Sequence, residues 1–353
     1  MKIAYIIPRL VKKGPIIVVQ DIIKNIVNKS DVIHVYHFGN ENDILFDCPT
    51  YRINLFTKID FNYYDIVHSH MLKPDLYIYL HRDRSSIKPK YITTLHQNIF
   101  DNLSSDYNPF FAFFIEKIWI KILSKQDVIV TLTNVMKQYY TNINKNLNFS
   151  TIYNGRDINI NNIDTSSIEF DLLLTLKLKY KLIGVHCLLT KRKGVNQIIQ
   201  ALVDLKEYVL IIIGNGKELE KLKSLATDLN VIDRCYFLGF KSNAISYLSL
   251  VDIYIMSSYS EGFPLALLEA GNLGKPIVCS DIEIFRELFS DNEVCFFELD
   301  NINSLVCAIL KIENNINKYS FNIKEKITNN YTNTQMAINY RNLYENSLNN
   351  LII

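Results

Sequence analysis

The chain has 353 residues, of which 48% are hydrophobic and 21% are charged, with a formal net charge of +2. This length is enough for two domains that each bury a core of their own, and the composition is that of an ordinary globular protein. The small net charge argues against nucleic acid as a partner, because it provides no strong electrostatic attraction.

The six cysteines include no C-x-x-C pair, so we expect free, buried thiols in a cytoplasmic protein: Cys48, Cys187, Cys235, Cys279, Cys295 and Cys307. The first ten residues are broken by Pro8 too early for a signal peptide. No apolar run reaches the ~18 residues needed to span a bilayer. We therefore expect a cytoplasmic protein, either soluble or peripheral on the inner face of the membrane.

Short apolar runs predict the strands of the first domain: residues 2–7, 32–38, 66–69, 91–95 and 128–131. Each run is apolar throughout, which is typical of a parallel sheet covered on both faces. Helical patterns lie between the runs. The first half of the chain is therefore predicted to be a doubly wound α/β domain, which binds ligands at the carboxyl ends of its strands.

Three features follow the predicted strands of this domain. Gly14 and Pro15 are suited to begin a helix over 16–27, with Gly14 as the cap and Pro15 at its start. We expect His68 to pack internally, and we expect His70 and His96 to lie at the ligand edge of the sheet. The spacing of these histidines does not favour a zinc site.

Residues 109–125, PFFAFFIEKIWIKILSK, predict a helix in which Lys117, Lys121 and Lys125 share one face. Aromatic and aliphatic side chains cover much of the rest. Either this helix packs on its own sheet and exposes the lysines to solvent, or it is a basic amphipathic helix that lies in a membrane interface.

Asn154 and Gly155 follow a predicted strand and suit a hinge turn. A linker is expected within 156–178, so the predicted domains are residues 1–165 and 175–325, with a C-terminal helix over 326–353 that returns to the first domain. Further apolar runs predict the strands of the second domain: residues 182–189, 209–213, 235–238, 253–256, 276–279 and 294–297.

Three consecutive cations follow the first strand of the second domain, at Lys191, Arg192 and Lys193, and Gly194 comes directly after them. Cations at a strand end can neutralise a diphosphate leaving group, although a solvated basic loop is the simpler interpretation. Gly214 and Gly216 form a glycine turn that lacks the third glycine of a dinucleotide-binding fingerprint.

The strand at 253–256 runs through a polar turn into Glu261, Gly262, Phe263 and Pro264, and a helix is predicted over 265–270. Gly262 permits close approach of a ligand, and Pro264 suits the first helical position. The first amides of the helix are expected to be free and to form an anion site. Glu269 lies about 8 Å further along the helix, so two carboxylates flank that site.

The run from Glu261 to Ala270, with Gly274-Lys275-Pro276 and Ser280-Asp281 after it, closely resembles the donor site of retaining GT-B-fold glycosyltransferases of group 1, or family 4. The resemblance implies an α/β GT-B fold, in which two Rossmann-like doubly wound domains face each other across a cleft. It also implies transfer from a nucleotide diphosphate sugar, with a UDP-sugar favoured and a GDP-sugar possible. The implied acceptor is a glycan or a lipid-linked glycan of bacterial surface polysaccharide: capsule, O-antigen or lipopolysaccharide. No cofactor and no obligatory metal are expected.

The resemblance assigns roles to individual residues. His96 matches a strand-end histidine near the reacting sugar, and Asn154 lies in a Pro-Asn-Gly-like motif. The arginine position of the family holds Leu188, so Arg192 or Lys191 would have to substitute. The expected catalytic residues are Glu261, His96 and Lys193; the expected donor contacts are Arg192, Gly262, Phe263, Pro264, Leu265, Glu269 and Gly14; the expected acceptor-side residues are His70 and Asn154.

Two alternatives remain open. The chain could be a GT-B-fold epimerase or hydrolase acting on the same nucleotide sugar, or a catalytically silent partner subunit that binds the sugar nucleotide. A Rossmann dehydrogenase is disfavoured, because the first strand is not followed by a G-x-G-x-x-G turn.

Overall fold

The computed structural model describes residues 1–26, 28, 30–83, 89–104, 108–160 and 163–349. The chain forms two compact units: unit 1 comprises Met1–Arg156 and Tyr331–Ile353, and unit 2 comprises Asp157–Asn330. The expected boundaries were 165, 175 and 325. The last predicted residue of the first helix, residue 27, and the end of the predicted C-terminal helix, 350–353, lie outside the described residues.

Unit 1 contains a seven-stranded parallel sheet with the order β3-β2-β1-β4-β5-β6-β7. Its strands are β1 (Lys2–Ile7), β2 (Val32–His37), β3 (Thr50–Arg52), β4 (Ile66–His70), β5 (Lys90–Leu95), β6 (Val128–Thr131) and β7 (Phe149–Thr151). Strand β3 was not among the predicted strands, because its three residues are exposed and form no apolar run.

Helices cover both faces of this sheet: α1 (Gly14–Ile26), α2 (Leu72–His81), α3 (Ile99–Ser104), α4 (Pro109–Leu123), α5 (Asn134–Ile143) and α14 (Asn333–Leu348). Ala4 and Val67 face a core that includes Tyr77 of α2. The next residues along β1 and β4, Tyr5 and His68, face the opposite side and contact Tyr344 of α14. This alternation follows from the two-residue period of a strand.

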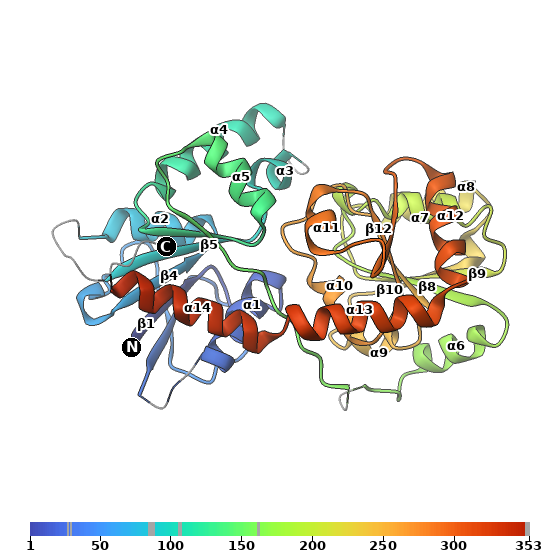
Figure 1. Cartoon of the computed structure of the whole chain (residues 1–353), viewed down its shortest axis with the longest axis horizontal. Coiled ribbons are helices and arrows are strands. Elements are labelled where there is room, and N and C mark those ends of the chain that lie inside the picture. Colours follow the sequence, from blue (N-terminus) through green and yellow to red (C-terminus); the bar gives the residue numbers. More distant parts are fainter. Residues whose placement is uncertain (27, 29, 84–88, 105–107, 161–162, 350–353) are drawn as a thin grey trace. The chain divides into compact units, whose positions relative to one another are not determined.

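The C-terminal helix α14 belongs to unit 1, where it lies beside α1 (Figure 1). The chain leaves unit 1 at Arg156 and returns at Tyr331. A hydrogen bond joins these two residues, because the Arg156 amide donates to the Tyr331 carbonyl at 2.9 Å. Gly155 permits this close crossing: a Cβ atom there would lie 1.9 Å from the Thr332 carbonyl oxygen.

Unit 2 contains a six-stranded parallel sheet with the order β10-β9-β8-β11-β12-β13. Its strands are β8 (Lys181–His186), β9 (Tyr208–Ile213), β10 (Cys235–Gly239), β11 (Ile253–Met256), β12 (Ile277–Ser280) and β13 (Val294–Phe297). The first of these ends at His186, before the predicted end at residue 189. Leu188, which prolonged the apolar run, is 62% exposed in the loop that follows.

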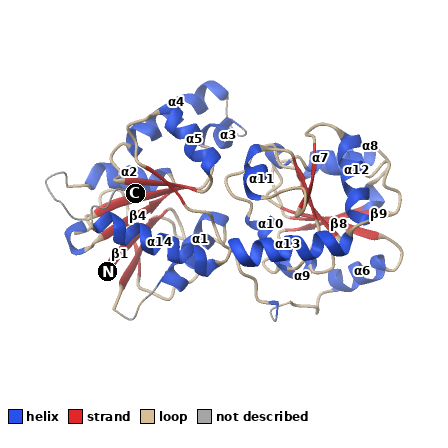
Figure 2. Ribbon diagram, viewed as in Figure 1, coloured by secondary structure: helices blue, strands red, loops and turns tan. Residues whose placement is uncertain are grey.

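The helices of unit 2 are α6 (Ile168–Lys177), α7 (Val195–Ala201), α8 (Leu219–Asp228), α9 (Ala244–Leu248), α10 (Leu265–Asn272), α11 (Glu283–Leu288), α12 (Ile302–Glu313) and α13 (Ile316–Asn330). A single 3-10 turn, η3 (Lys191–Lys193), precedes α7. Both units are therefore parallel α/β domains, which confirms the predicted fold class (Figure 2). The expectation of buried cysteines is confirmed for Cys235, Cys279 and Cys295, whereas Cys48 and Cys187 are half-buried and Cys307 is exposed.

Candidate functional site

The turn between β11 and α10 differs from its predicted form. Pro264 occupies the cap of α10, with φ −87° and ψ 73°, and is not the first helical residue. The Leu265 amide donates to the Phe263 carbonyl at 3.1 Å, and the Leu267 amide donates to the Pro264 carbonyl at 3.0 Å. The expectation of free first amides is therefore wrong for Leu265 and Leu267, because the turn folds back on itself.

Glu261 is buried in this turn and is surrounded by donors. Lys193 Nζ donates to Oε1 at 2.5 Å, Ser258 Oγ donates to Oε1 at 2.6 Å, and Arg192 Nη1 lies 3.5 Å from Oε2. Burial by itself would raise the pKa of Glu261, but the charges of Lys193 and Arg192 outweigh burial and lower that pKa. We call Glu261, Lys193 and Arg192 the Glu261 cluster.

The loop that carries the two cations is fixed against the β11–α10 turn. Ser257 Oγ donates to the Lys193 carbonyl at 3.0 Å, and the Tyr259 amide donates to the Arg192 carbonyl at 2.8 Å. Gly194 adopts a left-handed conformation with φ 60°, and a Cβ atom there would lie 2.1 Å from the Ser257 carbonyl oxygen. Glycine is thus required for the two loops to meet.

The Glu261 cluster carries two positive charges and one negative charge, so it keeps an excess positive charge in a region with little water. Such a region attracts an anion more strongly than a solvated lysine does. The backbone beside the cluster is also shielded from solvent, because Gly262, Phe263 and Pro264 are buried and Leu265 is half-buried. The cluster is therefore suited to hold a phosphate-bearing ligand.

Glu269 lies on α10 and is buried, with Oε2 3.8 Å from Nδ1 of His186. Burial lowers the pKa of His186, while the nearby Glu269 carboxylate acts to raise it. His186 was not among the site residues expected from the sequence. Its position at the carboxyl end of β8 was the available signal, because ligands bind at that end of parallel strands.

Three histidines of unit 1 lie close together at the carboxyl ends of β4 and β5. His70 Nδ1 is 2.8 Å from His96 Nε2, and the rings of His68 and His70 are 4.3 Å apart. Both ring nitrogens of His68 are occupied, by Tyr344 at 2.6 Å and by Thr94 at 2.9 Å. His68 is therefore an internal packing residue, as expected, whereas His70 and His96 form a bonded pair.

The loss of water around these rings lowers the pKa of His68 and of His96 to about 3, and that of His70 also falls well below its ordinary value. All three imidazoles are consequently neutral near pH 7. In the bond between His70 and His96, one ring donates and the other accepts. The remaining nitrogen of His70, Nε2, is buried and has no hydrogen-bond partner among the described residues.

The other two expected residues of unit 1 are Gly14 and Asn154. Gly14 is the first residue of α1. Asn154 is buried next to the crossing at Gly155, and its Oδ1 atom has no hydrogen-bond partner within the described ranges. Between the described residues, no hydrogen bond joins Gly14 or Asn154 to His70 or His96.

Comparison with known families gives a match in each half of the chain. Residues 31–160 match the family described as Glycosyltransferase Family 4, and residues 174–330 match the family described as Glycosyl transferases group 1. The chain is similar to the O-antigen biosynthesis glycosyltransferase WclY of Escherichia coli, with 30% identity over 365 residues and 98% of each chain covered.

A shorter similarity, 30% identity over 140 residues, covers 38% of this chain and 36% of the UDP-Gal:alpha-D-GlcNAc-diphosphoundecaprenol alpha-1,3-galactosyltransferase of Escherichia coli. Among solved structures, sucrose-phosphate synthase from Thermosynechococcus elongatus has a TM-score of 0.80 with 16% identity, and 99% of each chain is covered. At that identity the likeness shows a common fold alone.

Proposed function

This chain belongs to the group 1 glycosyltransferases, and we propose that it moves a sugar, with retention of anomeric configuration, from a nucleotide diphosphate sugar to a lipid-linked glycan in O-antigen assembly. Similarity to the O-antigen enzyme WclY along 98% of each chain supports a role for this chain in surface polysaccharide synthesis. The name of a second relative includes a UDP-sugar donor and a diphosphoundecaprenol-linked acceptor. A UDP-sugar is therefore the favoured donor, with a GDP-sugar as the alternative.

The observation that carries this proposal is the Glu261 cluster in unit 2. Lys193 and Arg192 would pair with the donor diphosphate and stabilise the negative charge that develops as it leaves. Glu261 would orient the transferred sugar, and Glu269 would bind the ribose. The backbone from Gly262 to Leu265 would contact the donor beside these side chains.

In unit 1, the neutral His70–His96 pair would lie on the acceptor side of the reaction. A neutral imidazole can accept a hydrogen bond from a hydroxyl group or donate one, which suits it to position the acceptor hydroxyl or the reacting sugar. We assign that role to His96, with His70 holding its ring. Gly14 and Asn154 complete the proposed set, as a donor contact and an acceptor-side residue respectively.

The proposal is tested in two steps. A saturation-transfer NMR screen against UDP- and GDP-sugars identifies the donor, and an assay with a diphosphoundecaprenol-linked oligosaccharide, with and without EDTA, measures transfer. The anomeric coupling constant of the product distinguishes retention from inversion. Release of free or epimerised sugar in the absence of acceptor would indicate a hydrolase or an epimerase instead of a transferase. Donor binding without transfer to any lipid-linked acceptor would indicate a catalytically silent subunit.

Helix α4 supports peripheral contact with the membrane that carries such an acceptor. Its inner face is buried through Ala112, Glu116 and Trp119. The outward side chains include four phenylalanines and an isoleucine, with Phe110 72% and Ile118 58% exposed, and Lys117 and Lys121 are exposed among them. Within the part of the chain that the structure describes, no helix is long and apolar enough to cross a bilayer. We propose that α4 lies in the membrane interface.

Co-sedimentation with liposomes that contain anionic lipid tests this contact. We expect binding at low salt, and we expect the double variant Phe110→Ser with Phe114→Ser to lose most of it, because buried apolar area drives interfacial binding. Phe321→Ser on α13 is the matched control, since Phe321 is also exposed on a helix. Equal co-sedimentation of the double variant and the wild type would contradict the proposed contact.

A further inference from the structure

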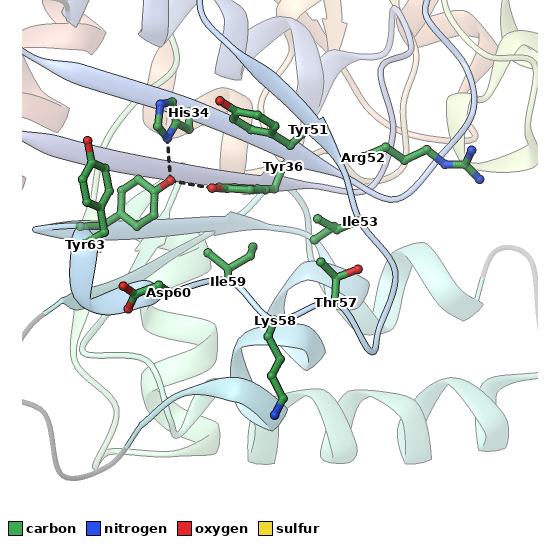
Figure 3. Close-up of a pocket in the computed structure, with 11 residues that line it drawn as sticks. His34, Tyr36, Tyr51, Arg52, Ile53, Thr57, Lys58, Ile59, Asp60 and Tyr63 are labelled. Atoms are coloured by element: carbon green, nitrogen blue, oxygen red, sulfur yellow. Dashed lines mark hydrogen bonds between the residues drawn. The ribbon is translucent and has the colours of Figure 1, made fainter.

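Unit 1 contains a hollow of about 550 Å³ that the proposed reaction does not use. It lies at the β2–β3 edge of the sheet, where the connection between β3 and β4 folds back beneath the two strands (Figure 3). Aromatic side chains dominate its upper wall, and the side chains of Arg52 and Lys58 extend away from these rings (Figure 3). Its lining residues are His34, Tyr36, Tyr51, Arg52, Ile53, Thr57, Lys58, Ile59, Asp60, Tyr63 and Tyr64.

The aromatic wall is held in place by its own hydrogen bonds. The Tyr64 hydroxyl forms hydrogen bonds with two neighbours, His34 Nδ1 at 2.6 Å and the Tyr36 hydroxyl at 2.6 Å (Figure 3). Tyr51 stacks on Tyr36 with the ring centroids 5.4 Å apart. Lys2 lies over the ring of Tyr63, 4.0 Å from its centroid. These rings are thus fixed before any ligand arrives, which lowers the entropy lost on binding.

The chemistry of the lining matches a saccharide. Tyr51 and Tyr63 are each 44% exposed, so part of their apolar ring surface is in contact with water. A ligand that covers these rings removes that surface from water, which favours binding. Thr57 and Asp60 add hydrogen-bonding groups to the lining, whereas the charged ends of Arg52 and Lys58 point away from the aromatic rings (Figure 3). A sugar ring offers C–H faces to the aromatic rings and hydroxyls to the polar groups, which is the mixture that such a pocket selects.

The hollow lies away from the histidine pair. In the sheet register, His34 on β2 pairs with Ala4 on β1, which in turn pairs with Val67 on β4. His70 lies three residues after Val67, so it is two strands across the sheet from His34 and three residues further along. The strand rise and spacing put the Cα atoms of His34 and His70 about 14 Å apart. Tyr36 packs on the sheet face covered by α2, whereas His68 packs on the opposite face against α14. His70, two residues after His68, lies on the face of His68.

We propose that this hollow is a saccharide-binding site, separate from the site of transfer, that holds a stretch of the glycan which the enzyme helps to build. The saccharide chemistry rests on the lining residues. The choice of a bacterial surface glycan as the ligand rests on the proposed function. Binding at this site would keep unit 1 attached to the glycan without occupying the histidine pair.

The test uses the full-length protein on an array of bacterial surface oligosaccharides, followed by NMR titration of the glycan that gives the highest signal. We expect Tyr51→Ala and Tyr63→Ala to weaken binding by about tenfold or more, because they remove the exposed aromatic rings of the wall. Tyr51→Phe keeps the ring and should retain most of the affinity. Phe56→Ala is the matched control: Phe56 is 89% exposed in the same connection and does not line the hollow.

The result is separable from the fate of the transfer reaction. His96→Ala should abolish transfer and leave array binding unchanged, which would separate the hollow from the histidine pair even if the assigned acceptor proved wrong. The absence of array binding by the wild type would overturn the proposal. Equal binding by the wild type and a folded Tyr51→Ala with Tyr63→Ala variant would do the same, as would equal losses in Phe56→Ala.

Discussion

Glu261 is a carboxylate that the fold has removed from water and placed between Lys193 and Arg192. All three side chains are mostly buried, so their charges interact in a medium that screens them weakly. Removing the Glu261 carboxylate leaves both cations without a counter-ion, which is strongly unfavourable. The same weak screening makes the two cations effective against the charge of a diphosphate. On the proposed function, stability and donor binding would therefore depend on the same three residues.

Glu261→Gln keeps the shape of the side chain and removes its charge. We expect turnover to fall by about a hundredfold or more, since the residue would no longer orient the sugar and the cations. The melting temperature should also fall, because Lys193 and Arg192 lose their counter-charge. Steady-state kinetics and thermal unfolding measure the two effects. Glu325→Gln, at an exposed position of α13, is the control; full turnover in Glu261→Gln would refute the assigned role.

Glu269→Ala should act on donor binding more than on chemistry. Its carboxylate lies beside His186 and is proposed to hold the ribose, which is remote from the bond that breaks. We expect KM for the donor to rise by about tenfold, with kcat changed by less than about threefold. Initial-rate kinetics with varied donor measure this split, and Glu283→Ala at an exposed position of α11 is the control. A fall in kcat with unchanged KM would contradict the role.

At the scale of elements, η3 and the β11–α10 turn meet only because residue 194 is glycine. Gly194→Ala would both strain a left-handed backbone and drive a Cβ atom into the Ser257 carbonyl. The loop that carries Lys193 would have to move. We expect a loss of several kcal/mol in the free energy of unfolding and a large loss of donor affinity, measured by denaturant unfolding and calorimetric titration.

Gly239→Ala separates the two causes, because Gly239 has a similar φ of 70° but a Cβ atom there would meet nothing within 4 Å. Only the backbone strain remains, so we expect a loss of about 1 kcal/mol and unchanged donor affinity. Equal effects of the two substitutions would show that the close contact with Ser257 is unimportant for the site.

The elements could be predicted from the sequence wherever a strand is buried on both faces. Residues 2–7 and 253–256 are examples, since their short, continuous apolar runs favour a central strand. The exposed strand β3 has no such signal. The position of Pro264 was also wrong by one residue, because sequence patterns locate helix ends poorly. The hollow at the β2–β3 edge could therefore not be predicted from the sequence, since β3 forms part of its wall.

The site was predictable only in part. The run from Glu261 to Glu269 is local in sequence, so its residue types could be interpreted from their spacing. The pairing of Glu261 with Lys193 joins residues 68 positions apart and depends on β8 and β11 being neighbours in the sheet. The 2.8 Å bond between His70 and His96 likewise depends on the pairing of β4 with β5. No local pattern encodes such contacts.

For the whole molecule, burial of ionisable groups couples stability to pH. Burial lowers the pKa of five histidines: His37, His68, His70, His96 and His186. In unit 1, burial raises the pKa of Asp75 to about 6, against the effect of hydrogen bonds from Ser69, Thr93 and Trp119. These two kinds of group act on stability in opposite directions.

A histidine with a lowered pKa binds its proton more readily when the chain is unfolded, so its contribution to stability is lost as the pH falls below about 6.5. The folded pKa of His68 is about 3, so its contribution to the free energy of unfolding would fall by about 2 kcal/mol between pH 6.5 and pH 5. Asp75 binds its proton more readily in the folded chain, so it partly offsets this loss below about pH 6. We therefore expect the free energy of unfolding to fall from pH 7 to pH 5.

Urea unfolding at a series of pH values measures this decline, and the slope gives the number of protons taken up on unfolding. His68→Asn should reduce that slope by about one proton near pH 5, whatever it does to absolute stability through the lost bonds to Tyr344 and Thr94. His81→Asn is the control, since His81 is outside the group of buried histidines and is only partly buried on α2. A slope that is unchanged in His68→Asn would show that His68 is not the neutral, buried group described above. The pH dependence would then have to arise from the other histidines, whose substitution in turn would locate it.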